Sequence, residues 1–290
     1  MKLPKCDLLG IGLSVYDHSL FIDHHPEPDE KTVAQSSSAS LGGPACLGTL
    51  CANRLGLKTV LISAVGSDPQ GGFIRENQQE FTSHKLIEVN CGNSALATII
   101  VKPDGKRSVI ALPSKNIKFQ PIEYLEAPKY ILCDGRLALE YYEVIAEMVA
   151  KGSQLILDAG SANQGIRKLL PICNTLICSI KFAQDYTGET SSEHAFKCLT
   201  KEFNQFAVTM GKQGLLYKNN SSQGHLPAVN VDVINSNGAG DIFHGSFIAA
   251  THHKLDFFHA LKKASEIAAW HCTQINSNES LKSLPKQKFF

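Results

Sequence analysis

The seven residues 235–241, NSNGAGD, combine small side chains with one acid directly before an apolar run. Two glycines around an alanine let backbone N–H groups point at an anion, and a helix beginning here adds about half a positive charge. A carboxylate beside such a turn can accept the proton of an attacking hydroxyl. The pattern predicts a phosphate-binding turn in which Asp241 acts as a base. The alternative is a plain helix entry in which Asp241 only favours the helix dipole.

Glycines gather at three further places. Gly42 and Gly43 precede a helix-like segment, where the lack of side chains lets a ligand approach the backbone closely. The segment 66–68, Gly-Ser-Asp, follows a strand-like run. The segment 10–15 partly fits a dinucleotide-binding pattern, but its third glycine is replaced by valine and the following residues look like a strand. A nicotinamide oxidoreductase is therefore the least favoured interpretation.

Short apolar runs alternate with helix-like stretches along most of the chain. The expected strands are Cys6–Leu13, Thr59–Val65, Tyr130–Cys133, Leu155–Asp158, Thr175–Cys178, Phe206–Thr209 and, feeding the glycine-rich turn, Val229–Ile234. Helices are expected at Pro44–Leu55 and Glu140–Lys151. Such alternation predicts an α/β fold whose mostly parallel sheet is covered on both faces. Ligands of such a sheet lie outside the carboxyl ends of its strands.

Two β-rich pieces, about 13–40 and 93–113, do not fit this alternation. In the first, short strands are expected near Leu20–Ile22 and Thr32–Ala34, separated by a turn. The second reads as a hairpin of Ala97–Val101 and Arg107–Leu112 joined through Pro, Asp and Gly. We expect the two pieces to pair as a small second sheet.

Charge and cysteine content exclude several classes of protein. Lys and Arg total 28 against 27 Asp and Glu, so a net charge of +1 provides no field to attract nucleic acid or an anionic membrane. The nine cysteines are odd in number and contain no Cys-x-x-Cys pair, which argues against a disulfide framework or a zinc site. We predict a cytoplasmic protein in a reducing compartment, with no metal-ligating residues and neither nucleic-acid nor membrane partners.

Taken in order, these motifs resemble the ribokinase and PfkB family of carbohydrate kinases. The resemblance runs over nearly the whole chain, from Gly12 and Asp17 through Gly42-Gly43 and the segment 66–68 to the Gly-Ala-Gly-Asp at 238–241. It implies ATP-dependent transfer of the γ-phosphate to a hydroxyl of a small sugar or sugar derivative. The implied cofactors are ATP and Mg²⁺, with a monovalent cation as a further candidate.

The resemblance also implies the architecture. The chain would form one ribokinase-like domain over residues 1–290, a three-layer α/β sandwich with a mostly parallel central sheet. The two β-rich pieces, about 13–40 and 93–113, would form its small β-sheet lid. Closure of such a lid would exclude water and favour transfer to the sugar over hydrolysis of ATP.

Roles follow for particular residues. Asp241 is the implied general base, and the anion hole is formed by the amides of Gly238, Ala239 and Gly240. The implied sugar contacts are Asp17, Gly42 and Gly43. The implied nucleotide contacts are Thr209, Gly211, Gly214 and Ser179.

Two arginines could favour an anionic acceptor. Arg107 lies in the second strand of the hairpin, and Arg136 follows Asp134 and Gly135 at the end of a strand. With the paired glycines, this pattern is similar to family members that act on modified or acidic hexoses, including sulfofructose kinases. The alternative is that both arginines are ordinary surface residues.

Several positions depart from the family pattern. Asn235 and Ser236 stand where Asp and Thr are usual, and Cys46 occupies the region of an Asn that contacts a sugar hydroxyl. The Asn-x-x-Glu motif associated with magnesium falls at 179–182, where its Glu is absent. Two alternatives therefore stay open: a nucleoside or phosphosugar kinase of the same fold, and a catalytically weak sugar-binding or regulatory homologue.

The lid segments also suggest self-association. Apolar residues flank Asp23 and Lys31, and exposed strand edges can pair with another copy of the chain. We predict a lid-mediated homodimer whose other partners are the sugar and ATP.

Overall fold

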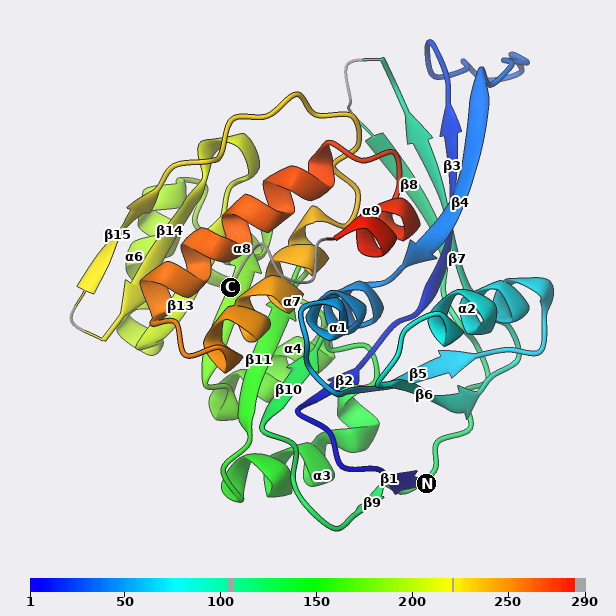
Figure 1. Cartoon of the computed structure of the whole chain (residues 1–290). Helices are drawn as coiled ribbons and strands as arrows, with labels where there is room; N and C mark the ends of the chain where they lie inside the picture. The colour runs from blue at the N-terminus through cyan, green and yellow to red at the C-terminus, as the bar shows by residue number, and fades with distance from the viewer. Residues whose placement is uncertain (104–106, 221, 285–290) are drawn as a thin grey trace.

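Nine strands form the central sheet of the computed structural model, which describes residues 1–103, 107–220 and 222–284 (Figure 1). The sheet order is β15-β14-β13-β12-β11-β10-β2-β5-β6. In chain order the strands are Leu8–Ile11 (β2), Thr59–Val65 (β5), His84–Asn90 (β6), Tyr130–Cys133 (β10), Gln154–Ala159 (β11), Thr175–Ser179 (β12), Gln205–Thr209 (β13), Leu215–Asn219 (β14) and Ser222–Leu226 (β15). The strands from β13 to β6 pair in parallel, and β14 and β15 extend the sheet antiparallel.

Successive residues of the buried strands enter two separate cores, because strand side chains alternate between the two faces of a sheet. In β10, Leu132 belongs to one apolar cluster, whereas Ile131 and Cys133 belong to the other. Helices that contribute to the first cluster are α1 (Pro44–Arg54), α2 (Pro69–Gln79), α7 (Ala239–His252), α8 (Phe257–Cys272) and α9 (Ser277–Ser283). The second receives α3 (Ala138–Ala150), α4 (Gln164–Leu169), α5 (Ile180–Thr187) and α6 (Ser192–Glu202). The predicted three-layer α/β fold is confirmed.

The two β-rich pieces fold into one small sheet. Its order is β4-β3-β7-β8, with the strands Val15–Phe21 (β3), Ser36–Gly42 (β4), Ala95–Val101 (β7) and Arg107–Leu112 (β8). Strand β3 pairs antiparallel with β4 and parallel with β7, and β7 pairs antiparallel with β8. Figure 1 shows this sheet at the upper right, apart from the central one. A further short pair joins β1 (Lys2–Leu3) to β9 (Glu123–Tyr124).

Two predicted strands do not form where expected. Val229–Ile234 forms no strand, and the N–H groups of Ile234 and Asn235 donate instead to the Cys272 carbonyl of α8, at 2.8 and 3.1 Å. The strand expected at Thr32–Ala34 forms later in the chain, at Ser36–Gly42. Pairing with β3 selects that serine-rich stretch, whose side chains have little intrinsic strand preference.

Candidate active site

The residues 235–241, hereafter the glycine turn, lead directly into α7. Gly238 has a left-handed backbone with φ 80°, and the helix begins at the next residue. Asn235 braces the turn, since its Oδ1 accepts from the Asn237 N–H at 2.9 Å and its Nδ2 donates to the Ile275 carbonyl at 2.8 Å. The Asn235 amide thus both accepts and donates a hydrogen bond, whereas an aspartate carboxylate could only accept. Because the first N–H groups of a helix lack acceptors within it, the start of α7 is suited to an anion.

Asp241 lies in the first turn of α7 and is half-buried. Its carboxylate accepts no hydrogen bond from the described residues, so its oxygen atoms keep their capacity to accept one. Burial, followed by the charges of Asp158, Asp17 and Asp134, raises the pKa of Asp241 well above its usual range, and only His244 opposes this shift. A raised proton affinity is consistent with the general-base role predicted for Asp241.

Asp17, the predicted sugar contact, comes from β3 of the small sheet and reaches the glycine turn. It is buried, and its Oδ2 accepts a hydrogen bond from Asn237 Nδ2 at 2.8 Å. Burial raises the pKa of Asp17 to about 6, opposed by the hydrogen bond from Asn237 and by Arg107. Gly42 of β4 faces the same carboxylate, which a Cβ at that position would overlap. The small sheet and the glycine turn therefore meet at Asp17.

Asp134 follows β10 and organises the neighbouring loops. Its Oδ2 accepts from the Leu13 N–H at 2.7 Å, and its Oδ1 accepts from the Arg136 N–H at 3.0 Å. Gly43, with φ 96°, lies against the Leu13 carbonyl. Arg136 is exposed, and its charge lowers the pKa of Asp134 against the larger effect of burial, which raises it. Asp134 thus links the backbone of Arg136 to Leu13, which in turn lies against Gly43.

A cavity of about 580 Å³ opens beside the glycine turn. The predicted site residues that line it are Thr209, Gly211, Gly214, Ala239, Gly240 and Arg107. Ser179 pairs in register with Thr209 at the carboxyl ends of β12 and β13, but it does not line the cavity. Its hydroxyl instead caps α5 by accepting from the Phe182 N–H at 3.0 Å. Most of the predicted nucleotide contacts and part of the anion hole therefore share one hollow.

Arg107 connects the small sheet to this cavity. It lies at the start of β8, and its Nη1 donates to the Ser236 hydroxyl at 2.6 Å. Its charge also acts on Asp17. The Arg107 side chain therefore lies between the Asp17 carboxylate and this cavity, rather than beside the predicted sugar contacts alone.

Sequence reasoning missed residues that hold the site together. Asn237 reaches Asp17, and His271 of α8 lies with its Nε2 2.6 Å from the Asn237 carbonyl and its Nδ1 2.7 Å from the Ser280 hydroxyl. His244 lies three residues after Asp241, and that helical spacing could have placed both on one face of α7. No comparable local signal marks His271.

The family departures have structural consequences. Phe182, at the position of the absent Glu, is fully buried and stacks on Tyr186 with ring centroids 5.5 Å apart. Cys46 is fully buried beneath the site. Asp68 is a local brace, because it caps α2 through the Gly71 N–H and accepts from the N–H and hydroxyl of Ser94.

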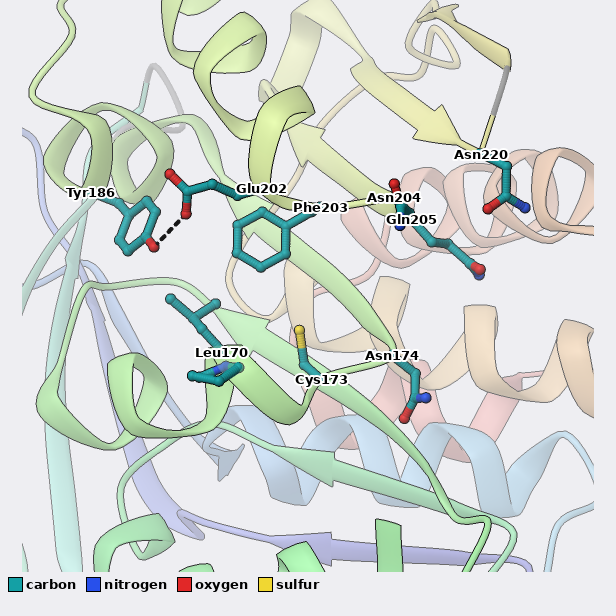
Figure 2. A pocket seen from close by; sticks show the side chains of 10 residues that line it. Leu170, Cys173, Asn174, Tyr186, Glu202, Phe203, Asn204, Gln205 and Asn220 are labelled. Atoms are coloured by element: carbon teal, nitrogen blue, oxygen red, sulfur yellow. Dashed lines mark hydrogen bonds between the residues drawn. The ribbon is translucent and has the colours of Figure 1, made fainter. Parts of the chain in front are cut away.

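A second hollow, of about 490 Å³, lies at the opposite ends of the strands (Figure 2). Cys173 and Asn174 precede β12, and Asn204 precedes β13, so this hollow adjoins their amino ends. Figure 2 shows Tyr186 and Glu202 pointing toward one another, joined by a 2.8 Å hydrogen bond. None of the predicted site residues lines it.

Neither a membrane-spanning helix nor a metal-binding cluster occurs in the described part of the chain. No helix there has both the length and the apolar character needed to cross a bilayer. Nor do three or more His, Cys, Asp or Glu side chains gather there in a way that could hold a metal ion.

Known proteins share this fold and these motifs. The pfkB family of carbohydrate kinases matches residues 6–284. Deoxyribokinase of Salmonella typhi is 23% identical over 96% of each chain. Among solved structures, ribokinase of Giardia lamblia has a TM-score of 0.82 at 16% identity, covering 96% of each chain. Arabidopsis thaliana ribokinase has a TM-score of 0.77 at 20% identity, covering 97% of this chain and 98% of the other. The chain therefore belongs to the pfkB family of carbohydrate kinases, which are phosphotransferases.

Proposed function

We propose that this chain transfers the γ-phosphate of ATP to a hydroxyl of a small sugar or sugar derivative, with Asp241 as the general base. The hydrogen bond from Asn237 to Asp17 carries the proposal, because it joins the turn that bears the base to the predicted sugar contact. A cavity lined by Thr209 and Gly240 opens beside that turn. The Arabidopsis relative, whose structure is described with ribose and ATP, supports the choice of substrates.

In the proposed reaction the acceptor lies between the small sheet and α7. Asp17 accepts hydrogen bonds from sugar hydroxyls that do not react, and Gly42 and Gly43 let the sugar approach the backbone. Asp241 takes the proton of the reacting hydroxyl as its oxygen bonds to phosphorus. The amides of Gly238, Ala239 and Gly240 stabilise the charge on the transferring group.

The small sheet is proposed to act as a lid within a single domain of residues 1–290. Its link to the glycine turn runs through Arg107 and Asp17. Closure over the acceptor would exclude water, which otherwise competes for the phosphoryl group. Arg107 would then lie close to the transferring phosphate.

ATP is proposed to occupy the cavity next to Thr209, Gly211 and Gly214, with Ser179 nearby. Magnesium arriving with ATP neutralises charge on the phosphates. Because Phe182 is buried where the family motif has Glu, we assign no residue to the ion and infer that ATP and water hold most of its coordination sphere. A monovalent cation stays a candidate, tested by exchanging K⁺ for Na⁺.

An acidic sugar derivative is a second candidate acceptor. Arg136 adjoins Asp134, which holds the loop next to Gly43, so a cation stands near the proposed sugar contacts. Arg107 supplies another on the lid side. A carboxylated or sulfonated hexose would be recognised by these charges, whereas a neutral pentose would not.

The test is magnesium-dependent ADP formation with a panel of ketoses, pentoses, nucleosides, sugar acids and phosphosugars. We expect turnover with one acceptor class and a loss of about 10²- to 10⁴-fold in kcat for Asp241→Asn, the usual contribution of a general base. Asp185→Asn is the matched control, because Asp185 is exposed and pairs only with Lys181. Nucleotide binding without turnover of any acceptor would favour the catalytically weak homologue.

A lid-mediated homodimer is also proposed. Ile110 and Leu112 of β8, an edge strand, are 65% and 46% exposed and lie on one face of the small sheet. Burying such a face against a second copy would remove apolar area from water. Light scattering should give twice the mass of one chain for the parent protein and the mass of one chain for Ile110→Lys. A monomeric parent protein would refute the proposal.

A further inference from the structure

Asp158 and His244 form a buried pair beneath the glycine turn that the proposed reaction does not use. Asp158 lies near the end of β11, and His244 lies on α7 one turn after Asp241. His244 Nδ1 is 3.1 Å from Asp158 Oδ2, and the two side chains are only 5% and 7% exposed. Apart from this approach, Asp158 Oδ2 has no hydrogen-bond partner among the described residues.

Both ring nitrogens of His244 face oxygen atoms. Nδ1 is 2.7 Å from the Gly240 carbonyl, besides its approach to Asp158, and Nε2 is 3.2 Å from the Ile177 carbonyl. Backbone carbonyls only accept hydrogen bonds, and a neutral imidazole has a single N–H. A neutral ring would therefore aim a lone pair at one carbonyl, whereas an imidazolium donates on both sides.

The charges around the base come from four elements. Asp241 is faced by Asp158 of β11, by Asp134 after β10, by Asp17 of β3 and by His244 of its own helix. Arg136 acts on Asp134, and Arg107 acts on Asp17. His244 is the group among those facing Asp241 that favours its ionised form.

Burial and hydrogen bonding act in opposite directions on this pair. Burial, followed by the charge of Asp134, raises the pKa of Asp158 to about 8, and burial lowers the pKa of His244, so the buried environment favours two neutral groups. The carbonyls of Gly240 and Ile177 oppose this effect, but the pKa of His244 stays below its ordinary value on balance, so a charged ring is inferred from the geometry of the two carbonyls and Asp158. A buried charge is tolerated only beside its counter-charge, so loss of either partner would neutralise the other.

We propose that His244, held as an imidazolium by Asp158, is a positioning residue that fixes Gly240 and favours the ionised form of Asp241. The inference rests on the proposed function, because it assigns His244 to the same base. His244 touches no reacting atom. It acts through the Gly240 carbonyl, one residue before Asp241, so a change in its charge alters both the geometry of the turn and the field at the base.

The first experiment needs no substrate. Nitrogen-15 NMR of the histidine rings in the full chain at pH 7, with His244 assigned by the signals lost in His244→Gln, reports the protonation of each ring nitrogen. We expect both nitrogens of His244 to carry protons in the parent protein and the ring to become neutral in Asp158→Asn. A neutral His244 ring in the parent protein would overturn the proposal, whatever the enzyme phosphorylates.

The second experiment separates positioning from simple loss of fold. We expect His244→Gln and Asp158→Asn each to lower kcat at least tenfold, while KM for ATP and for the acceptor stays within threefold. The kcat of the double variant should be no lower than that of the worse single variant. Ser246→Ala is the matched control, because Ser246 is buried on the same helix but contacts Cys51, and it should keep kcat within twofold. Additive losses, or losses that follow the melting temperature of each variant, would overturn the pairing. If no acceptor is turned over, the NMR result alone decides.

Discussion

The two ends of the parallel sheet carry hollows of similar size but opposite chemistry. At the carboxyl end, a cavity of about 580 Å³ is lined partly by the glycine turn, and the buried Asp17 carboxylate contacts that same turn. At the amino end, a hollow of about 490 Å³ is lined by polar side chains such as Glu202 and Asn204, which are exposed. The pKa of Asp17 is raised to about 6 by burial, whereas Glu202 is solvated and hydrogen-bonded to Tyr186.

The difference shows that volume alone does not mark a site. Burial of an ionisable group costs free energy. Buried ionisable groups are therefore concentrated at functional sites, where their altered proton affinity is used. The carboxyl end holds several such groups around one turn, and the amino end places its charged side chain in water. Substitutions at the carboxyl end should therefore change activity strongly, and substitutions at the amino end should not.

Apart from loss of the proposed base Asp241, the largest effect is expected from Gly42→Ala. A Cβ on Gly42 would overlap the Asp17 carboxylate, which Asn237 holds from the other side. Either β4 or the Asp17 side chain must shift, and misplacement by about 1 Å can cost on the order of 10²-fold in rate. We expect kcat/KM for the acceptor to fall by that amount or more in steady-state assays.

Gly72→Ala is the control for this change. No heavy atom outside its own helix lies within 4 Å of a Cβ built at Gly72, which is in α2. Alanine in a helix is favoured over glycine by about 1 kcal/mol, so this variant should be slightly more stable and equally active. Equal activity of both variants would show that the close contact between Gly42 and Asp17 does not matter for activity.

A smaller effect is expected from Asp17→Asn. The Asn side chain can still accept from Asn237, but it loses the charge that strengthens hydrogen bonds from sugar hydroxyls. We expect KM for the acceptor to rise about tenfold, with KM for ATP unchanged. In the parent protein, KM for the acceptor should rise in the same way as the pH falls below about 6, where Asp17 becomes protonated. A KM that is flat from pH 5 to pH 8 would contradict this assignment.

The stability of the folded protein should respond to pH in the opposite direction from acceptor binding. The pKa of Asp17 is about 6 in the folded chain against a usual 3.8, so the folded state binds more protons than the unfolded state between those values. A tenfold difference in proton affinity is equivalent to about 1.4 kcal/mol. Above pH 6 the ionised Asp17 therefore destabilises the folded state by up to about 3 kcal/mol. Below about pH 3 this destabilisation is absent, because Asp17 is protonated in both states. Thermal denaturation should show Asp17→Asn to be the more stable protein at pH 7, with the difference shrinking as the pH falls to 4. A variant that is less stable at pH 7 would refute this account.

Local patterns predicted the sheet where strands are continuous apolar runs. Thr59–Val65 and Tyr130–Cys133 form with the predicted bounds, because each is buried on both faces. Val229–Ile234 alternates valine with an asparagine and an aspartate, and it has no neighbouring strand to pair with among the described residues. Ser36–Gly42 has a weak strand signal and pairs because β3 lies beside it. Pairing is a property of the fold, so neither outcome could be seen in the local sequence.

The same distinction applies to the candidate site. The glycine turn is local, so its residues could be proposed from their spacing. The bond between Asn237 and Asp17 joins residues 220 positions apart, and the approach of His271 to Asn237 spans 34 positions. Such contacts depend on which elements the topology brings together. The roles of the predicted site residues stay predictions, which the variants above test.

The smallest effect is expected at the amino end, from Tyr186→Phe. This change removes the 2.8 Å hydrogen bond to Glu202, but it keeps the stacking on Phe182 and the contact of Arg167 with the ring face, 5.4 Å from its centroid. A hydrogen bond to an exposed carboxylate contributes about 1 kcal/mol or less, so urea denaturation should show a loss within that limit. Activity should stay within twofold of the parent protein. A tenfold loss of kcat without unfolding would mean that the two ends of the sheet are coupled, and the contrast between the proposed catalytic end and the polar amino end would no longer hold.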